Sequence, residues 1–150
     1  MRGSFDRSTR IGASPTDAWE KLHDVDLLAS FSSHLGKVAV VEPGRAWTVS
    51  LQDRVGPLRL SAPMHVEIVG ETPEEDVSIR AHGRDRGPGT SLVVEAVVRV
   101  RQRAKNRELL LEGTFELSGR VARLGAGVAK RQADRMIDEF WANLTMALQT

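Results

Sequence analysis

Between residues 38 and 117, apolar and polar residues alternate along most of the chain. A period of two gives each strand one covered face and one wet face, which favours an antiparallel sheet over a parallel one. Turn dipeptides such as Pro43-Gly44 and Gly56-Pro57, and the Gly87-Pro88-Gly89 run, separate the alternating segments. With an N-terminal run added, the pattern predicts about seven strands in mostly consecutive hairpins, forming a sheet that curls. The expected strands are 5–11, 38–42, 47–52, 58–68, 77–82, 92–100 and 109–117.

Two short helices are expected near the N-terminus. Ser14 is a good N-cap, Pro15 fits the first helical position, and Asp17 can meet free N–H groups there. A second short helix begins at Asp24 or Asp26 and extends to the region of Phe31.

The C-terminal segment predicts a long amphipathic helix that starts near Ser118-Gly119 and ends near Leu148. At 1.5 Å per residue it would span about 42 Å, enough to cross the open face of the sheet. Its first half is rich in alanine and glycine, whereas Met136 and Phe140 belong to a bulky second half. The small half either approaches the sheet closely or leaves room for something else, and the sequence leaves both interpretations open.

Length and composition narrow the class of protein. The chain has 150 residues, which fits one α+β domain over residues 1–150. It has no cysteine, which excludes a disulfide scaffold and cysteine-ligated zinc. With 21 basic and 20 acidic residues, no global field attracts nucleic acid. No apolar run approaches the roughly 18 residues of a membrane span, and no signal-peptide pattern opens the chain, so a cytoplasmic location is expected.

Several segments resemble a known family. Residues 13–24 (ASPTDAWEKLHD) follow the first strand, and 117–125 (LSGRVARLG) join the last strand to the long helix. Val55-Gly56-Pro57-Leu58 and Gly87-Pro88-Gly89-Thr90 add weaker support. The whole chain resembles the START-like, or birch-pollen-allergen-like, helix-grip superfamily (SRPBCC), and within it the CoxG family, which is named for carbon monoxide dehydrogenase. Many members of that family carry an extension thought to reach the membrane; this chain stops at Thr150, so no membrane tether is expected.

The resemblance implies a deep, mostly apolar cavity between the long helix and the sheet. Ordinary core packing is the alternative explanation for each wall residue taken singly. The expected wall consists of in-facing strand positions and the apolar stripe of the helix, with two residues of the preceding loop region at the mouth. The strand candidates are Trp47, Leu60, Met64, Ile79, Ala81, Val94, Ala96 and Phe115, the helix candidates are Ala129, Ala133, Met136, Ile137 and Phe140, and the mouth candidates are Phe31 and Leu35.

Polar chemistry is sparse in this pattern. His34 lies between the mouth candidates and can either bind a ligand head group or be a plain loop histidine. The strand parity that faces the helix is expected to carry almost no ionisable residue. Proton-transfer chemistry needs a placed acid and base, so no catalytic residue, cofactor or metal is predicted. Related polyketide cyclases often use tyrosine in the cavity, and this chain has none.

Arg99, Arg101 and Arg103 project from one face of a strand near a hairpin tip. They form either a patch for weak contact with an anionic membrane or acidic partner, or a solvated face that pairs with Glu108, Glu112 or Glu116. The second interpretation is favoured.

The leading functional hypothesis is a non-catalytic carrier of a lipid, quinone or polyketide-like molecule. The resemblance also implies an accessory role beside a carbon monoxide dehydrogenase-type enzyme. The alternatives are a cyclase, aromatase or hydrolase acting on a hydrophobic substrate, and an interaction module with a closed core. The sequence predicts no oligomeric state.

Overall fold

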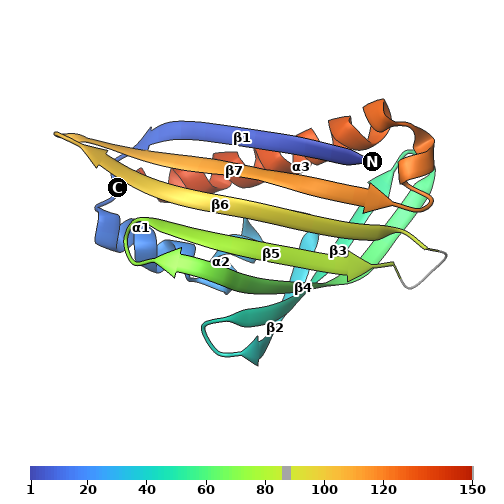
Figure 1. Ribbon diagram of the computed structural model, residues 1–150, viewed down its shortest axis with the longest axis horizontal. Helices are drawn as coiled ribbons and strands as arrows, with labels where there is room; N and C mark the ends of the chain where they lie inside the picture. Colours follow the sequence, from blue (N-terminus) through green and yellow to red (C-terminus); the bar gives the residue numbers. More distant parts are fainter. Residues whose placement is uncertain (86–88, 150) are drawn as a thin grey trace.

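The computed structural model describes residues 1–85 and 89–149. Its main layer is one seven-stranded sheet in which every neighbouring pair is antiparallel, in the order β1-β7-β6-β5-β4-β3-β2 (Figure 1). The predicted α+β class and curved antiparallel sheet are confirmed. The expected turn at Gly87-Pro88-Gly89 lies partly outside the described residues. The strands are β1 (Arg2–Ile11), β2 (Leu35–Glu42), β3 (Ala46–Val55), β4 (Leu58–Thr72), β5 (Asp76–Arg84), β6 (Ser91–Arg103) and β7 (Asn106–Ser118).

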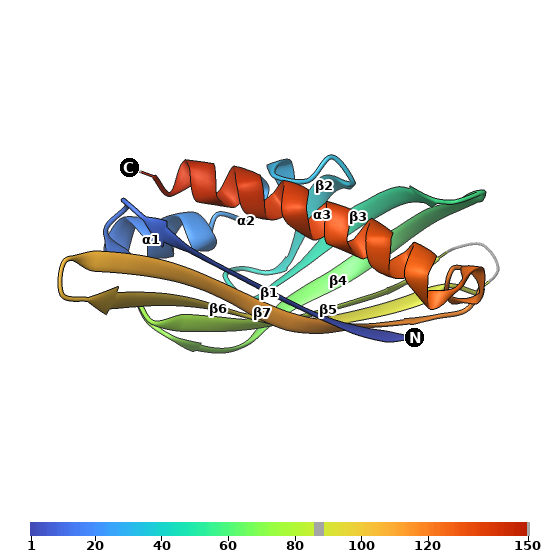
Figure 2. The same cartoon turned by 90° about the horizontal axis from the view of Figure 1, so that it is seen from above.

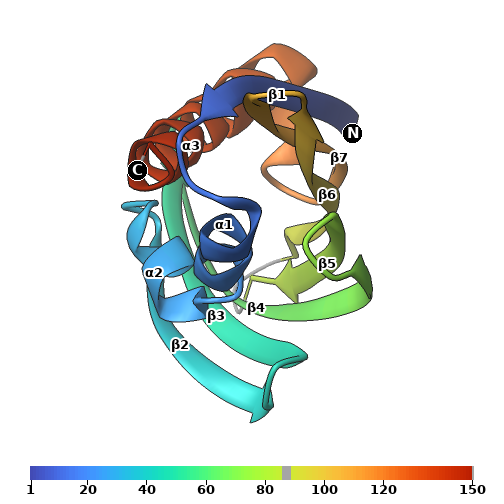
Figure 3. The same cartoon turned by 90° about the vertical axis from the view of Figure 1, so that its left-hand side faces the viewer.

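Strands β2 to β7 follow one another as a meander, and β1 closes the sheet by pairing with β7. The sheet curls strongly, so that its concave face wraps around the helices in the end view of Figure 3. One edge is β1 and the other is β2, and the longest helix runs along the sheet above the concave face (Figure 2).

The two short helices begin where the sequence predicts. In α1 (Pro15–Leu22), Ser14 Oγ accepts a hydrogen bond from Asp17 N at 3.1 Å. In α2 (Val25–Ser30), an oxygen of the Asp24 carboxylate accepts one from Leu27 N at 3.1 Å. Each cap satisfies an N–H group that has no partner inside the first helical turn. Both helices lie within the concave side at one end of the sheet (Figure 3).

The long helix α3 (Ala126–Ala147) begins later than predicted. Residues Ala122–Leu124 form a separate 3₁₀ turn, η1, and Gly125 has φ 102° and ψ 147°. That backbone conformation is open almost only to glycine and cannot continue a helix. The expected helix start near Ser118-Gly119 is therefore wrong, and the 22-residue α3 spans about 33 Å instead of 42 Å.

The C-terminal end of α3 is tied down. Leu148, which follows the helix, is fully buried, and its carbonyl accepts hydrogen bonds from Gly12 N at 3.0 Å and Ala13 N at 2.9 Å. Leu144 is buried in the same apolar cluster. We call this cluster the closed end; its buried members are Ile11, Ala13, Ala18, Leu22, Phe31, Val100, Leu109, Leu144 and Leu148.

The arginine run lies on β6 and its hairpin with β7. Arg99 forms an ion pair with Glu112 of β7, and Arg101 stands opposite Glu108 in the register of the two strands. Arg101 and Arg103 are exposed. The ion pair agrees with the favoured interpretation of a solvated face with cross-strand pairing.

Candidate functional site

A cavity of about 170 Å³ lies between the sheet and the N-terminal half of α3. Its walls come from β1, β3, β4, β6, β7, the segment flanking η1 and the helix itself. Apolar side chains make up the lining except at two positions, Asp53 and Gln132. The lining residues are Phe5, Leu51, Asp53, Val55, Leu60, Leu92, Val94, Phe115, Leu117, Val121, Ala129, Gln132, Ala133, Met136 and Ile137.

The sheet side of the cavity includes two aromatic rings that lie over glycines. Phe5 of β1 pairs with Gly113 of β7, and Gly3 pairs with Phe115. A methyl group on Gly113 would come within 2.6 Å of Phe5 Cζ, and one on Gly3 would collide with the Phe115 ring. Each ring thus fills the space that a side chain would take on the neighbouring strand, and both rings line the cavity.

The polar end of the cavity is built around Asp53. This residue follows Trp47, Val49 and Leu51 at a period of two on β3, so it shares their burial and points to the cavity. Its side chain is only 3% exposed. The expectation that the helix-facing parity carries almost no ionisable residue is therefore wrong at this position. The signal was available, because Asp53 continues the alternation of its strand.

Asp53 has three neighbours that stabilise its negative charge. Gln132 Nε2 of α3 donates to Oδ1 at 2.8 Å and to Oδ2 at 3.0 Å, and Arg54 N donates to Oδ1 at 2.7 Å. His34 Nδ1 lies 3.2 Å from Oδ1 and the same distance from the carbonyl oxygen of Gln52. A buried carboxylate is tolerated when hydrogen bonds replace its lost hydration, and this one is well supplied.

The loop after α2, which we call the 31–35 loop, is fastened to α3 by two further side chains. Asn143 Nδ2 donates to the Phe31 carbonyl at 2.9 Å. The Glu139 carboxylate accepts hydrogen bonds from Ser33 N and, at 3.0 Å, from Ser33 Oγ. The hydrogen bond from the Ser33 backbone holds the pKa of Glu139 below its ordinary value of 4.5, and the Ser33 hydroxyl and nearby His34 act in the same direction.

The structure brings seven of the predicted wall residues together around the cavity. They are Leu60, Val94, Phe115, Ala129, Ala133, Met136 and Ile137. The room lies against the small half of the helix, as the second interpretation of the alanines supposed.

The other nine predicted residues do not line it. Phe31 and Phe140 pack in or against the closed end, with ring centroids 6.0 Å apart. Leu35, Met64 and Ala81 belong to a neighbouring apolar cluster that Met136 also contacts. The remaining four are elsewhere: Trp47 is buried near the end of β3, His34 lies behind Asp53, and Ile79 and Ala96 border a groove on the opposite side of the sheet.

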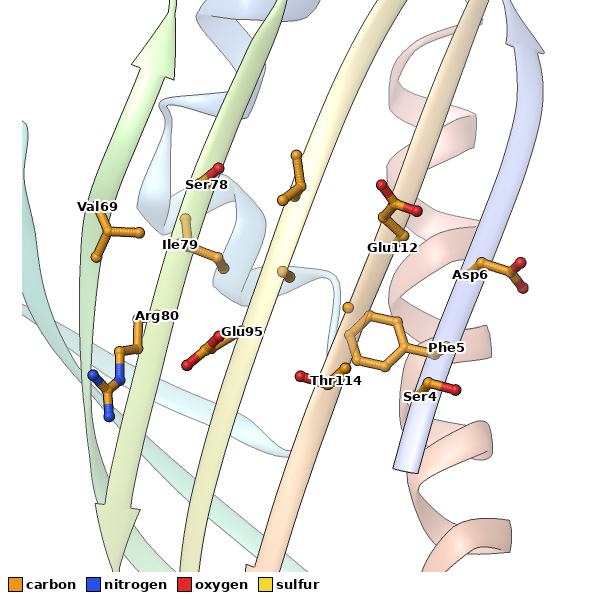
Figure 4. Close-up of a pocket in the computed structure, with 13 residues that line it drawn as sticks. Ser4, Phe5, Asp6, Val69, Ser78, Ile79, Arg80, Glu95, Glu112 and Thr114 are labelled. Atoms are coloured by element: carbon orange, nitrogen blue, oxygen red, sulfur yellow. The ribbon is translucent and has the colours of Figure 1, made fainter. Parts of the chain in front are cut away.

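That groove is larger and polar. It measures about 840 Å³ and crosses the outer face of β5, β6, β7 and β1 (Figure 4). Arg80, Glu95, Glu112 and Asp6 project from it among serine and threonine side chains. This mixture of opposite charges on a wet sheet face resembles an ordinary solvated surface more than a binding site.

Among the described residues, no three histidines or carboxylates come together as metal ligands. Within the same part of the chain, no helix is both long and apolar enough to cross a membrane.

A long helix held over a curled antiparallel sheet, with an apolar cavity between them, defines the helix-grip fold of the START-like superfamily. The chain belongs to the carbon monoxide dehydrogenase CoxG family, whose model matches residues 8–149. No curated protein matches the sequence.

Solved structures agree on the fold at low sequence identity. A conserved protein from Geobacillus kaustophilus is 15% identical, with a TM-score of 0.81 over 99% of this chain and 95% of that one. The Zhui aromatase/cyclase from Streptomyces sp. R1128 is 16% identical, with a TM-score of 0.68 over 99% and 92%. A START superfamily protein from Mycobacterium smegmatis is 8% identical, with a TM-score of 0.70 over 97% and 96%.

Proposed function

We propose that this protein binds and carries an apolar small molecule, of the lipid, quinone or polyketide-like class, in the cavity beneath α3. The observation that carries the proposal is the lining: thirteen of its fifteen residues are apolar and two are polar. Sites for small molecules have this composition, in which apolar walls give affinity and a few polar groups fix orientation. The cytoplasmic location expected from the sequence stays a prediction.

The test combines extraction with a cavity-filling variant. Native mass spectrometry of protein purified from its own host is expected to show a bound apolar molecule, and an apolar fluorescent dye is expected to bind and be displaced by it. Ala133→Leu adds three carbons to the cavity wall and should abolish dye binding while the far-ultraviolet circular dichroism stays unchanged. Ala142→Leu, on the exposed side of the same helix, is the matched control. Repeated extraction of nothing, together with dye binding that Ala133→Leu leaves intact, would overturn the carrier.

The second candidate is an enzyme of the cyclase, aromatase or hydrolase type, which the Asp53–His34 pair favours. The two side chains lie 3.2 Å apart, within reach of proton exchange. Carriage is preferred because only Asp53 lines the cavity, whereas acid–base chemistry on a bound substrate needs both groups at the reacting atoms. A His34→Gln variant separates the two, because a carrier would keep its ligand affinity and an enzyme would lose turnover of the extracted compound.

Family membership also supports an accessory role beside a dehydrogenase of the carbon monoxide type. Under this proposal, tagged protein expressed in its own host should co-purify with a molybdenum-containing dehydrogenase. Purification without any such enzyme, from cells shown to express it, would remove the accessory role and leave the carrier standing.

A further inference from the structure

The orientation of the Gln132 amide is fixed by chemistry. An ionised carboxylate only accepts hydrogen bonds, so Gln132 must turn its NH₂ group toward Asp53. The distances of 2.8 and 3.0 Å from Nε2 to the two carboxylate oxygens agree with this orientation. The amide oxygen, Oε1, is then left without a donor from the part of the chain that the structure describes. Because Gln132 lines the cavity, this oxygen is an acceptor for a ligand.

The two oxygens of Asp53 differ in the same way. Oδ1 receives Arg54 N and Gln132 Nε2, and His34 Nδ1 lies 3.2 Å away. Oδ2 receives only the longer bond from Gln132 Nε2 among residues 1–85 and 89–149. A carboxylate oxygen has room for a further donor at this occupancy. The polar end therefore offers two acceptors, Asp53 Oδ2 and Gln132 Oε1.

The size of the cavity limits what can reach these acceptors. An engineered protein cavity of about 150 Å³ with an apolar lining holds one benzene molecule. At about 170 Å³, the cavity of this protein therefore accommodates one six-membered ring with a small substituent. The rings of Phe5 and Phe115 in its wall suit an aromatic guest, since aromatic pairs gain energy beyond the area they bury.

We infer that the buried part of the ligand is a single neutral ring carrying a hydroxyl group, which donates a hydrogen bond to the Asp53–Gln132 acceptors. The inference rests on the proposed carrier function and names the chemistry of its ligand. A ligand carboxylate is disfavoured because it would face the charge of Asp53 in an apolar site. A ligand carbonyl is disfavoured because it brings no donor and would leave both acceptors unpaired.

Four probes of similar size test this inference: p-cresol, toluene, 4-methylbenzoate and 4-methylbenzylamine. Calorimetric or ligand-observed NMR titration should give p-cresol an affinity about tenfold above that of toluene, as expected for a hydrogen bond to a charged group. The benzoate should show no binding at the highest soluble concentration. Equal affinities for p-cresol and toluene would overturn the inference and leave the carrier intact. Tighter binding of the amine would overturn it in favour of a cationic ligand.

Two variants locate the effect. Gln132→Met keeps the length of the side chain and removes the amide, so the preference for p-cresol should fall toward unity while toluene still binds. Asp53→Asn removes the charge and should allow the benzoate to bind detectably. Gln102→Met, at an exposed position of β6, makes the same exchange away from the cavity and should leave all affinities unchanged. If none of the four probes binds the unaltered protein, both the inference and the proposed carrier fail.

Discussion

Gly113 shows how closely the cavity depends on single residues. It stands opposite Phe5 in the β1–β7 register, and the ring of Phe5 occupies the space in front of it. A side chain here would meet that ring and also the backbone oxygen of Glu95 on β6. The glycine is thus required by its neighbours, since both sides of the position are already filled.

Gly113→Ala is expected to lower the free energy of unfolding by about 1–3 kcal/mol, the usual cost of overfilling a packed site. Phe5 must move, so binding of an apolar dye should weaken as well. Urea denaturation and dye titration measure the two effects. Gly70→Ala provides the control, because nothing lies within 4 Å of the added methyl group. Equal stability of the two variants would show that Phe5 is not held against Gly113.

Asp53 marks what residue-level sequence analysis could and could not supply. The alternation of β3 places Asp53 on the same face as Leu51 and Val55, so its burial could be read from the strand pattern. Its partners could not, because Gln132 is 79 residues away and His34 lies in a loop of irregular backbone. Side-chain partners across elements depend on how the helix crosses the sheet, which local periodicity does not specify.

At the scale of elements, the 31–35 loop and α3 are joined mainly through polar side chains of the helix. Asn143 and Glu139 bond to loop residues, and Gln132 reaches Asp53, which also contacts His34. Ser33 is exposed, so its two hydrogen bonds to Glu139 are accessible to solvent. The attachment of the loop therefore depends on the ionisation of one carboxylate.

Acidification is expected to weaken this attachment. The pKa of Glu139 is lower in the folded protein than its ordinary 4.5, because Ser33 N donates to the ionised form. A carboxyl group of this kind contributes stability that is present above its unfolded pKa and is lost as the pH falls through the folded value. The difference in unfolding free energy between the unaltered protein and Glu139→Gln should accordingly shrink below about pH 4.5.

Urea unfolding at a series of pH values from 6 to about 3 measures this difference. Glu42→Gln, at the exposed end of β2, controls for the loss of one negative charge. A difference that stays constant across the series would show that the Ser33–Glu139 contact contributes nothing to folding.

The order of elements was predictable and the start of the long helix was not. Strand alternation, the Ser14 cap and the amphipathic stripe each carry a local signal, and each agrees with the structure. The stripe continues through the sequence of η1, so periodicity alone extends the helix too far toward the N-terminus. Gly125 carries the boundary, because its backbone takes a conformation that interrupts the helix.

For the molecule as a whole, the two ends of α3 differ. The closed end packs Leu144 and Leu148 among residues from β1, α1, β6 and β7. The other end lies over the cavity and enters the helix through Gly125. Stability and binding are therefore separated along the same helix, with the large side chains at one end and the free volume at the other.

This separation predicts that Leu148→Ala costs stability without changing the cavity. Leu148 is 0% exposed, so its truncation should lower the unfolding free energy by about 2–5 kcal/mol. Amide exchange at Gly12 and Ala13, which donate to the Leu148 carbonyl, should accelerate. Met146→Ala, at a residue 71% exposed, should stay within about 0.5 kcal/mol of the unaltered protein. A Leu148→Ala protein as stable as Met146→Ala would contradict the closed end as the main anchor.

The anchoring of α3 at Leu148 has a mechanical consequence. A rod held at one end is displaced in proportion to the distance from its pivot, and Ala126 lies at the far end of about 33 Å of helix. A tilt of only about 2° moves that end by about 1 Å over this length. The pocket lies along the half of the lever with the larger sweep, so its capacity is the dimension of the molecule that small rotations change most. A guest longer than one ring can thus be admitted by leverage, with the pivot undisturbed.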